Sequence, residues 1–398
     1  MNGDWISTWV ASPQPAGPDD LPPAPLRRRG LVFADCTLRQ TVHVTLGGQR
    51  LRLRLSNAYG SADLNLTGVC VALPRDGRAG VSAIQAGTSR RLTFGGQPGT
   101  DIPAGADAAS DPLDFDLAAG SNLTVTMYLA RGQTPGGVTA HPGSRTTSYL
   151  AAGNQVTGQD LAGEIPLDHW YFLSGLEVPA GAGACAVAIM GDSLCDGHGA
   201  TTNGNDRWPD RLFARLQLVP ARSRIAVLNQ GIGGNRVLND GLGPSALSRL
   251  ERDVLAQNAV RWLIVFEGVN DIGTAGPTQT AQQNVVQELI NAYRLIITRA
   301  RASGILVFGS TLTPLEGHDL YDAPPGSREE ARQAVNQWIR TSREFDAVLD
   351  FDRAVRDPAS PRQLLPAFDC GDHLHLSPAG YQALADAVPA RLLRGRRS

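Results

Sequence analysis

The sequence of 398 residues contains no lysine, so arginine supplies all 36 of its basic side chains. The ATP-binding loop of P-loop enzymes and the nucleotide site of protein kinases both require a lysine. Enzymes that form a Schiff base need one too, as do acyl enzymes built on a Ser-x-x-Lys motif. The missing lysine therefore excludes all of these chemistries, and we attribute it to codon usage in a GC-rich genome.

The sequence also has no apolar run of the roughly 18 residues that a membrane-spanning helix requires. Its first residues, Met-Asn-Gly-Asp-Trp, contain no apolar signal core. We therefore expect a cytoplasmic protein or, if a signal peptide was removed from it, a secreted or periplasmic one. The five cysteines form no Cys-x-x-Cys pair, which argues against a zinc ribbon or a thioredoxin-like site. A formal charge of −2 gives no indication of nucleic-acid binding.

The first half of the chain shows the alternation that is typical of β-strands. Residues 51–55 alternate strictly between leucine and arginine, as in a strand with one buried face. Similar patterns recur at residues 36–45, 62–73 and 122–129. Residues 12–26 contain six prolines and predict an extended arm without regular structure. We therefore expect an all-β domain, a sandwich or jelly roll, over residues 1–178.

The second half changes in character after a Pro- and Gly-rich stretch at residues 179–183. Short apolar runs predict strands at residues 184–190, 224–229, 261–266, 304–309 and 347–351. Helical patterns lie between them, near Pro209, near Pro244 and at residues 279–303 and 327–342. This alternation predicts a parallel sheet covered by helices on both faces over residues 184–398. In such sheets, ligands bind beyond the carboxyl ends of the strands.

Three loops after these predicted strands have sequences suited to catalysis. Gly-Asp-Ser-Leu at residues 191–194 follows the first strand, where a tight turn can expose the serine hydroxyl. Gly-Ile-Gly-Gly-Asn at residues 231–235 follows the second, and its glycines let backbone N–H groups approach a ligand. Glu-Gly-Val-Asn-Asp at residues 267–271 follows the third and supplies an amide that suits an oxyanion. Each loop taken singly also has a structural interpretation. The serine of the first could cap a helix, and the asparagine of the third could form an Asx cap. The second could be a plain tight turn or an interrupted dinucleotide-binding fingerprint.

A fourth loop carries Asp372, His373 and His375, just before a Ser-Pro pair at residues 377–378 that predicts the start of the last helix. Asp372 can hydrogen-bond to the ring of His375 and fix its tautomer. Two alternatives remain open. The two histidines could be metal ligands, although the spacing supplies no third ligand, and Asp369 could replace Asp372 as the carboxylate.

The order of these loops resembles that of the SGNH/GDSL hydrolase superfamily. The Gly-Asp-Ser-Leu block, Gly234, Asn270 and the Asp-x-x-His pair match its motifs residue by residue, within about residues 184–396. We assign the motif glycine to Gly234, and the adjacent Gly233 is the alternative. The resemblance implies a flavodoxin-like three-layer α/β/α fold. It also implies a serine ester hydrolase that works through an acyl-enzyme, without a cofactor or a metal.

The resemblance further implies a role for each matched residue. Ser193 is the nucleophile, His375 is the base that takes its proton, and Asp372 holds His375. The backbone N–H groups of Ser193 and Gly234 and the side chain of Asn270 form the oxyanion hole.

The expected substrate follows from the loop after Ser193, which is small and polar over residues 196–206. A lipase needs a wide apolar surface for its acyl chain. We therefore expect esters of short acyl or acetyl groups, and acetyl groups on a carbohydrate are one candidate. Arg207 and Trp208 are candidates to bind a polar alcohol. Alternatively, Arg207 pairs with a neighbouring carboxylate and Trp208 packs under the helix.

Two other classes of function stay open. One is a lipase, lysophospholipase or thioesterase acting on longer acyl chains. The other is a carbohydrate-binding protein without catalysis, because the first half resembles the β-rich domains of some carbohydrate esterases. Four aromatic residues could stack on sugars there or pack in a core: Trp5, Trp9, Trp170 and Tyr171. We expect a small-molecule or carbohydrate ester as the binding partner, and no nucleic acid.

Cys195 and Cys370 flank the predicted nucleophile and base in the sequence. A fold that brings Ser193 and His375 together can bring these cysteines within disulfide range or leave them as two thiols. A disulfide would indicate an oxidising compartment.

Overall fold

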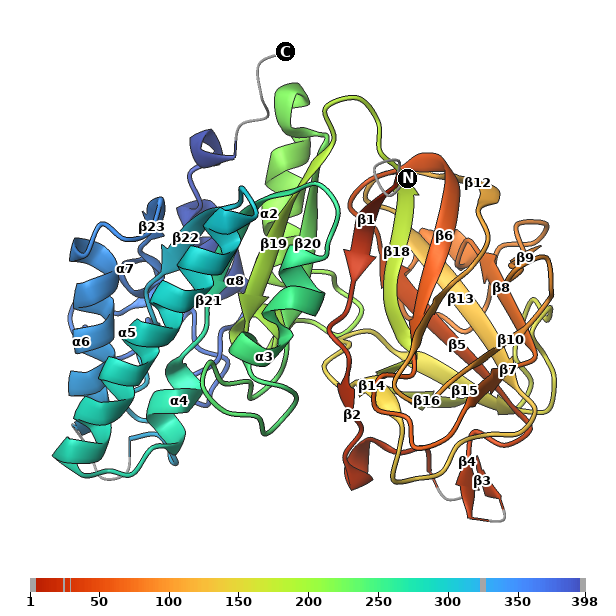
Figure 1. The fold of residues 1–398 in the computed structure, drawn as a ribbon, viewed down its shortest axis with the longest axis horizontal. Coiled ribbons are helices and arrows are strands. Elements are labelled where there is room, and N and C mark those ends of the chain that lie inside the picture. The colour runs from red at the N-terminus through yellow and green to blue at the C-terminus, as the bar shows by residue number, and fades with distance from the viewer. Residues whose placement is uncertain (1–4, 24–25, 29, 323–326, 394–398) are drawn as a thin grey trace. The chain divides into compact units, whose positions relative to one another are not determined.

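The computed structural model describes residues 5–23, 26–28, 30–322 and 327–393 (Figure 1). Three features of the sequence analysis extend beyond these residues. They are the N-terminal stretch examined for a signal sequence, the proline-rich arm at residues 24–25, and the last residues of the family resemblance. The described chain divides into two compact units. The N-terminal unit contains residues 7–179 and 202–205, and the C-terminal unit contains the rest. Within the described ranges, none of the helices is long and apolar enough to cross a membrane.

The N-terminal unit is β-rich and contains several antiparallel sheets (Figure 1). The strands of its two larger sheets are β1 (Trp5–Val10), β5 (Cys36–His43), β6 (Gly48–Ser56), β8 (Gly68–Ala72), β9 (Arg90–Arg91), β11 (Asp107–Ala109), β12 (Leu113–Leu117), β13 (Asn122–Leu129), β15 (Ser148–Ala152), β16 (Ile165–Leu167) and β18 (Leu173–Pro179). One sheet has the order β16-β15-β5-β13-β8-β9. The other has the order β1-β18-β6-β11, with β12 also paired to β6.

Three smaller sheets complete the N-terminal unit. Their strands are β2 (Gln14–Pro15), β3 (Arg27–Arg28), β4 (Leu31–Val32), β7 (Leu64–Leu66), β10 (Thr100–Ile102), β14 (Thr139–His141) and β17 (Trp170–Tyr171). The proline-rich arm is thus not wholly irregular, because β2 and a single 3-10 turn at Pro18–Asp20 lie within it. Proline is tolerated at both places, since β2 is an edge strand and a first helical turn needs no N–H donor.

The alternation of residues 51–55 divides β6 between two environments. Leu51, Leu53 and Leu55 are fully buried. Arg52 and Arg54 point to the other side, where both form ion pairs with Glu177 of β18. The period-2 pattern therefore predicted both the strand and its buried face.

Three of the four aromatic side chains considered for sugar stacking pack inside the N-terminal unit. Trp9, Trp170 and Tyr171 are buried, and the rings of Trp9 and Trp170 meet edge to face with centroids 5.0 Å apart. Trp5 is half-buried. The packing alternative is correct for the three buried rings, because a buried ring offers no face to a sugar.

The C-terminal unit is built on a parallel five-stranded sheet. Its strands are β19 (Cys185–Gly191), β20 (Ile225–Gly231), β21 (Val260–Phe266), β22 (Leu306–Ser310) and β23 (Ala347–Leu349). They have the order β20-β19-β21-β22-β23, which is the flavodoxin-like order that the family resemblance implied. Val187 of β19 aligns with Val227 on one side and with Trp262 on the other.

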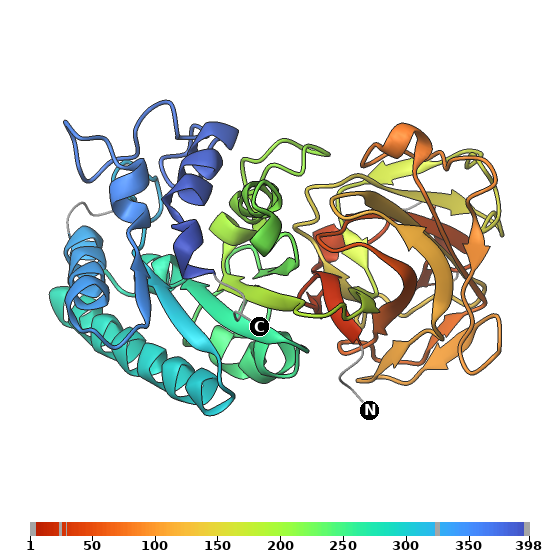
Figure 2. The ribbon, with the colours of Figure 1, turned by 90° about the horizontal axis from the view of Figure 1, so that it is seen from above.

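Helices cover both faces of this sheet (Figure 2). They are α1 (Ser193–Asp196), α2 (Trp208–Gln217), α3 (Ala246–Leu250), α4 (Val269–Thr274), α5 (Gln279–Ala302), α6 (Ser327–Thr341), α7 (Phe351–Val355) and α8 (Pro378–Ala387). A single π-helical turn, Glu251–Leu255, continues α3. The long α5 lies on one side of the sheet and α8 lies on the other.

The pleat of the strands gives the C-terminal unit two separate cores. In β19, Val187 and Ile189 belong to the core shared with α2, α7 and α8. Ala188 and Met190 face the core shared with α3, α5 and α6. This continuous apolar run is what a strand buried on both faces requires, and the result is a three-layer α/β/α domain.

Candidate active site

Ser193 begins α1 just after β19, an interior strand of the parallel sheet. Asp192 caps this helix through its carboxylate, which accepts the backbone N–H of Leu194 at 3.0 Å. Because α1 folds back onto the strand end, a Cβ at Gly191 would lie 2.2 Å from Sγ of Cys195. The glycine in the Gly-Asp-Ser-Leu block is therefore needed for the tight turn that presents Ser193.

Ser193, His375 and Asp372 form a continuous hydrogen-bonded series. Oγ of Ser193 lies 2.7 Å from Nε2 of His375, and Nδ1 of His375 lies 2.6 Å from Oδ2 of Asp372. The carboxylate can only accept a hydrogen bond, so Nδ1 carries the ring proton and Nε2 is left to accept from the serine hydroxyl. The structure thus brings together three residues that the sequence separates by up to 182 positions.

The carboxylate of Asp372 is held at both of its oxygens. Its Oδ1 accepts the backbone N–H groups of Leu374 at 3.0 Å and of His375 at 2.8 Å. Burial alone would raise the pKa of Asp372. The hydrogen bonds from the side chain and backbone of His375 outweigh burial and hold the pKa well below its usual range. Asp372 is therefore ionised at neutral pH and suited to stabilise a protonated His375.

Asp369, the alternative carboxylate, pairs instead with His373. Its Oδ2 lies 2.8 Å from Nδ1 of His373, and its Oδ1 accepts the backbone N–H groups of Gly371 and His373. His373 has a side chain that is 58% exposed. The loop therefore holds two Asp-His pairs, and the pair of Asp372 and His375 is the one that reaches Ser193.

The structure does not support His373 and His375 as joint metal ligands. Among the described residues, the side chains close enough to share a metal ion are His198, Asp372 and His375 in one group, and Asp369, Cys370 and Asp372 in another. Neither group combines the two histidines that the sequence alternative requires. His198 instead contacts His375, with ring centroids 4.1 Å apart.

The loop after β20 distinguishes its two adjacent glycines. The N–H of Gly233 donates to Oδ2 of Asp196 at 3.1 Å. The N–H of Gly234 has no hydrogen-bond partner within the described part of the chain, and neither has that of Ser193. Gly234 also has a φ of +70°, which strongly favours glycine. Gly234 is thus the glycine whose N–H is available to a ligand.

Asn270 lies in α4, the helix that follows β21 in the chain, and is 3% exposed. Its Nδ2 donates to the backbone carbonyl of Asn235 at 2.8 Å, and its Oδ1 accepts from the hydroxyl of Tyr321 at 2.7 Å. Since an amide nitrogen carries two hydrogens, one N–H of Asn270 remains for a ligand.

Comparison with known proteins identifies this half of the chain. Residues 189–383 match the model of the GDSL-like lipase/acylhydrolase family. These residues form a GDSL-like hydrolase domain. A catalytic triad and an oxyanion hole belong to this family, and the chain is accordingly an ester hydrolase.

Solved structures similar to the chain include three hydrolases. A proposed lipolytic protein of the G-D-S-L family from Desulfitobacterium hafniense is 20% identical, with 52% of this chain and 99% of that chain covered and a TM-score of 0.39. A GDSL-like lipase from Bacteroides thetaiotaomicron is 14% identical, with 52% and 87% covered and a TM-score of 0.38. A catalytic mutant of an acetylxylan esterase from Geobacillus stearothermophilus is 22% identical, with 53% and 97% covered and a TM-score of 0.39. None of the curated proteins matches the chain.

A buried arginine hydrogen-bonds to residues of all three loops that follow β19, β20 and β21. Arg249 of α3 is 1% exposed. Its guanidinium donates to the carbonyls of Gly191 and Gln230, to the side-chain oxygen of Asn235, and to the carboxylates of Asp253 and Glu267. Sequence reasoning missed Arg249, because its partners are up to 58 positions away and no motif includes it.

Three buried carboxyl groups of the GDSL-like domain, those of Asp192, Glu267 and Asp271, have raised pKa values. Burial is the main cause for Asp192, whose pKa rises to about 7, and for Glu267, whose pKa rises to about 8. Burial likewise raises the pKa of Asp271 to about 6, although its hydrogen bonds from the backbone N–H groups of Val237 and Leu238 lower it. The loops that carry the proposed catalytic groups therefore also contain buried carboxyl groups whose pKa values are raised toward neutral pH.

Of the two alternatives for Trp208, the structure supports packing under the helix over substrate binding. Trp208 is fully buried, and its ring packs against Phe351 with centroids 5.3 Å apart. It begins α2 on the face that turns toward the core. Arg207 caps α2, its backbone N–H donates to Asp210 at 3.2 Å, and its role in substrate binding stays a prediction.

The disulfide alternative for Cys195 and Cys370 is also wrong in this structure. All five cysteines are among the described residues, and each is a free thiol. Cys195 is buried, with Sγ directed at the carbonyl of Phe266, while Cys370 is exposed.

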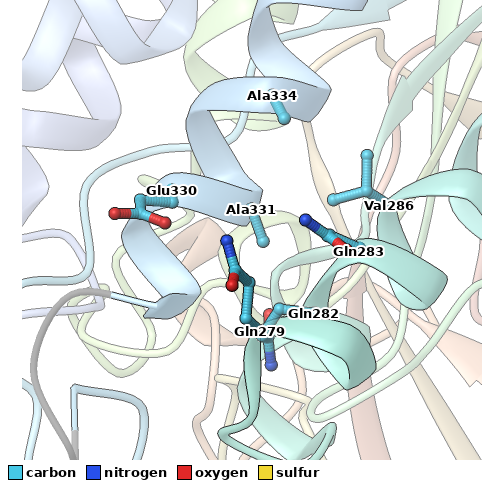
Figure 3. A pocket seen from close by; sticks show the side chains of 7 residues that line it. All are labelled: Gln279, Gln282, Gln283, Val286, Glu330, Ala331 and Ala334. Atoms are coloured by element: carbon cyan, nitrogen blue, oxygen red, sulfur yellow. The ribbon is translucent and has the colours of Figure 1, made fainter.

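A cavity of about 260 Å³ elsewhere in the GDSL-like domain lies between α5 and α6 (Figure 3). Its lining side chains are those of Gln279, Gln282, Gln283, Val286, Glu330, Ala331 and Ala334. It contains none of the predicted site residues, so we assign it no part in the reaction.

Proposed function

We propose that the chain is a serine ester hydrolase in which Ser193 is the nucleophile, His375 the general base and Asp372 the residue that orients His375. One observation carries the proposal. The distances of 2.7 Å from Ser193 to His375 and 2.6 Å from His375 to Asp372 give a nucleophile, a base and an orienting carboxylate in the required order.

The reaction then proceeds through an acyl-enzyme. Nε2 of His375 takes the hydroxyl proton as Oγ of Ser193 attacks the ester carbonyl, and the carbonyl oxygen becomes an oxyanion. The tetrahedral intermediate collapses, the C–O bond to the alcohol breaks, and His375 returns the proton to the departing alkoxide. A water molecule, deprotonated by the same nitrogen, then attacks the acyl-enzyme and releases the acid and free Ser193.

The oxyanion is stabilised by three N–H groups in this proposal. They are the backbone N–H groups of Ser193 and Gly234 and the remaining amide N–H of Asn270. Two of these donors are unpaired within the described residues, and the third has one hydrogen to spare. Preorganised donors of this kind stabilise the charge that develops in the transition state, and removal of one typically lowers the rate about 10²–10³-fold.

The proposed substrates are esters of short acyl groups, acetyl above all, with a carbohydrate as the alcohol. The polar loop at residues 196–206 supports this class, and Arg207 at its end is a candidate to bind the alcohol. We expect neither a metal nor a cofactor to take part, because the proposed steps need only proton transfer and hydrogen bonding.

One observation favours the second candidate, a hydrolase of longer acyl chains. Leu242 is 67% exposed although its side chain contacts Gly234, and Leu320, next to Tyr321 in the sequence, is 74% exposed. An exposed leucine beside Gly234 is suited to cover an apolar acyl chain.

A substrate panel tests these two candidates. Catalytic efficiency is measured on nitrophenyl esters of increasing acyl length and on acetylated sugars. A maximum at two to four carbons, with release of acetate from the sugars, supports the short-chain proposal. Efficiency that still rises at eight carbons or more contradicts it and favours the second candidate.

Labelling with an organophosphonate tests the nucleophile independently of substrate choice. We expect the wild-type chain and a Ser303→Ala control to be labelled and active. Ser193→Ala should lose the label and several orders of magnitude in kcat with its fold intact. Retention of more than about a tenth of the activity in Ser193→Ala would require another nucleophile.

A further inference from the structure

Tyr321 lies outside the four predicted loops, yet its side chain hydrogen-bonds to the side-chain amide of Asn270, a proposed oxyanion donor. It lies in the segment that follows β22, and its hydroxyl donates to Oδ1 of Asn270 at 2.7 Å. We propose that Tyr321 is a positioning residue, which holds the Asn270 amide so that its free N–H points at the oxyanion. This inference rests on the proposed function of the site.

The two ends of the Asn270 amide have separate anchors. The carbonyl of Asn235 can only accept a hydrogen bond, so it must face Nδ2 of Asn270, which donates to it at 2.8 Å. The hydroxyl of Tyr321 binds the other end, at Oδ1. With one anchor the amide can still rotate, whereas two anchors fix its plane and therefore the direction of the remaining N–H.

The fold holds the ring of Tyr321 in place as well as its hydroxyl. A Cβ at Gly273, three residues after Asn270 in α4, would lie 2.4 Å from Cδ2 of Tyr321. The ring thus packs directly on the helix that carries Asn270, over a residue that has no side chain. The ring also contacts that of His318, with centroids 4.8 Å apart, and the backbone N–H of Tyr321 donates to Nδ1 of His318 at 3.2 Å.

The hydroxyl of Tyr321 also stays protonated over the working range of an ester hydrolase. Burial, followed by the nearby carboxyl of Asp192, raises the pKa of Tyr321 to about 12. Tyr321 is therefore a donor to Asn270 at every pH at which His375 can serve as the base.

Loss of this hydroxyl has a predictable cost at Asn270. Oδ1 would be left buried without its donor, and the amide would be free to rotate toward another one. A hydrogen bond at the amide oxygen also polarises the amide and strengthens donation by its N–H groups. The oxyanion hole would therefore lose part of the contribution of Asn270 while the substrate-binding surface stays unchanged.

The test is a double-mutant cycle between Tyr321→Phe and Asn270→Ala. Tyr321→Phe should lower kcat on a nitrophenyl ester about tenfold to a hundredfold, with KM changed less than about twofold. In the Asn270→Ala background, Tyr321→Phe should have no further effect, because it acts through that amide. Tyr128→Phe, which removes a hydroxyl bonded to Asp35 in the N-terminal unit, is the matched control and should behave like the wild type.

Gly273→Ala provides a second route to the same result. The new methyl group pushes the ring of Tyr321 away without removing its hydroxyl, so kcat should fall in the wild-type background and not in Asn270→Ala. Thermal unfolding identifies any variant that has lost its fold. If Tyr321→Phe has wild-type kcat, or lowers kcat equally in both backgrounds, Tyr321 is not a positioning residue. An inactive, unlabelled wild-type chain would instead contradict the proposed function itself.

Discussion

The two Asp-His pairs of the last loop show how single residues divide their tasks. Asp369 with His373 and Asp372 with His375 are both bonded through Nδ1, at 2.8 Å and 2.6 Å. They differ in what Nε2 faces, because Nε2 of His375 reaches Ser193 while the side chain of His373 is largely exposed. The first pair fits a structural role in the loop, and the second fits catalysis.

This difference predicts unequal effects of two alanine substitutions. His375→Ala removes the proposed base and should lower kcat at least about 10³-fold. His373→Ala removes an exposed imidazole and its hydrogen bond to Asp369, and should change kcat less than about threefold. The measurement is kcat on a nitrophenyl ester, with circular dichroism to verify the fold. The reverse order of effects would transfer the base to His373.

The buried carboxyl of Asp192 makes the stability of the domain depend on pH. Burial raises its pKa from 3.8 to about 7. Between these two values, the folded protein keeps a proton that the unfolded chain has lost. Folding stability contributed by this group is therefore lost as the pH rises through that window.

Asp192→Asn should remove this dependence while keeping the cap on the N–H of Leu194. The side chain of the variant is neutral in the folded and the unfolded state. The free energy of unfolding of the variant minus that of the wild type should therefore increase by about 1 kcal/mol for each pH unit between pH 4 and pH 7. Urea unfolding of both proteins at pH 5, 6 and 7 measures the difference. Parallel curves for the two proteins would show that Asp192 ionises normally in the folded state.

At the scale of elements, the sequence predicted those features that depend on local pattern. The strand β19 and the helix α5 lie within one or two residues of the predicted runs, and Ser377 with Pro378 begins α8 as expected. The four motif loops lie where the pattern placed them, three after strand ends and one before α8, because chain order alone brings such loops to one sheet edge. The roles of their residues stay predictions.

Features that depend on three-dimensional packing could not be predicted in this way. The sequence left Trp208 between substrate binding and packing under the helix, and only the orientation of α2 shows that its ring lies in the core. Tyr321 lies 11 residues beyond the end of β22, and Arg249 lies within a helix. The loop after β22 that holds Tyr321 was not among the four predicted loops, and no local pattern shows that its hydroxyl meets Asn270.

The loop after β20 carries a prediction about its two glycines. In Gly234→Ala, the φ of +70° and a Cβ only 2.5 Å from Leu242 both oppose the native conformation. The N–H proposed to bind the oxyanion should therefore move, and kcat should fall about tenfold or more. Gly233→Ala is the matched control, because its Cβ would meet Asp196 at an ordinary 3.4 Å. A larger loss in Gly233→Ala would reverse the assignment of the oxyanion glycine.

At the scale of the whole molecule, the two units achieve stability without covalent cross-links among the described cysteines. Cys36 and Cys70 are buried in the N-terminal unit, and Cys185 and Cys195 are buried in the C-terminal unit. Each unit has a buried apolar core of its own, and units of this size can fold on hydrophobic burial alone. The thiols therefore serve as reporters of the intact fold.

Thiol titration with a chromogenic disulfide reagent checks this arrangement. Under denaturing, non-reducing conditions we expect all five cysteines to react, because each is a free thiol. In the native protein we expect one reactive thiol, the exposed Cys370, and Cys370→Ser should lower both counts by one. Although Cys370 is exposed, partial desolvation of its thiol, followed by the nearby carboxylate of Asp372, raises the pKa of Cys370 to about 11. Since the thiolate is the reactive form, the native reaction should be slow at pH 8 and accelerate as the pH rises toward 10. Three thiols in the denatured wild-type protein would instead reveal a disulfide, and a pair formed by Cys195 and Cys370 would then be the first to examine.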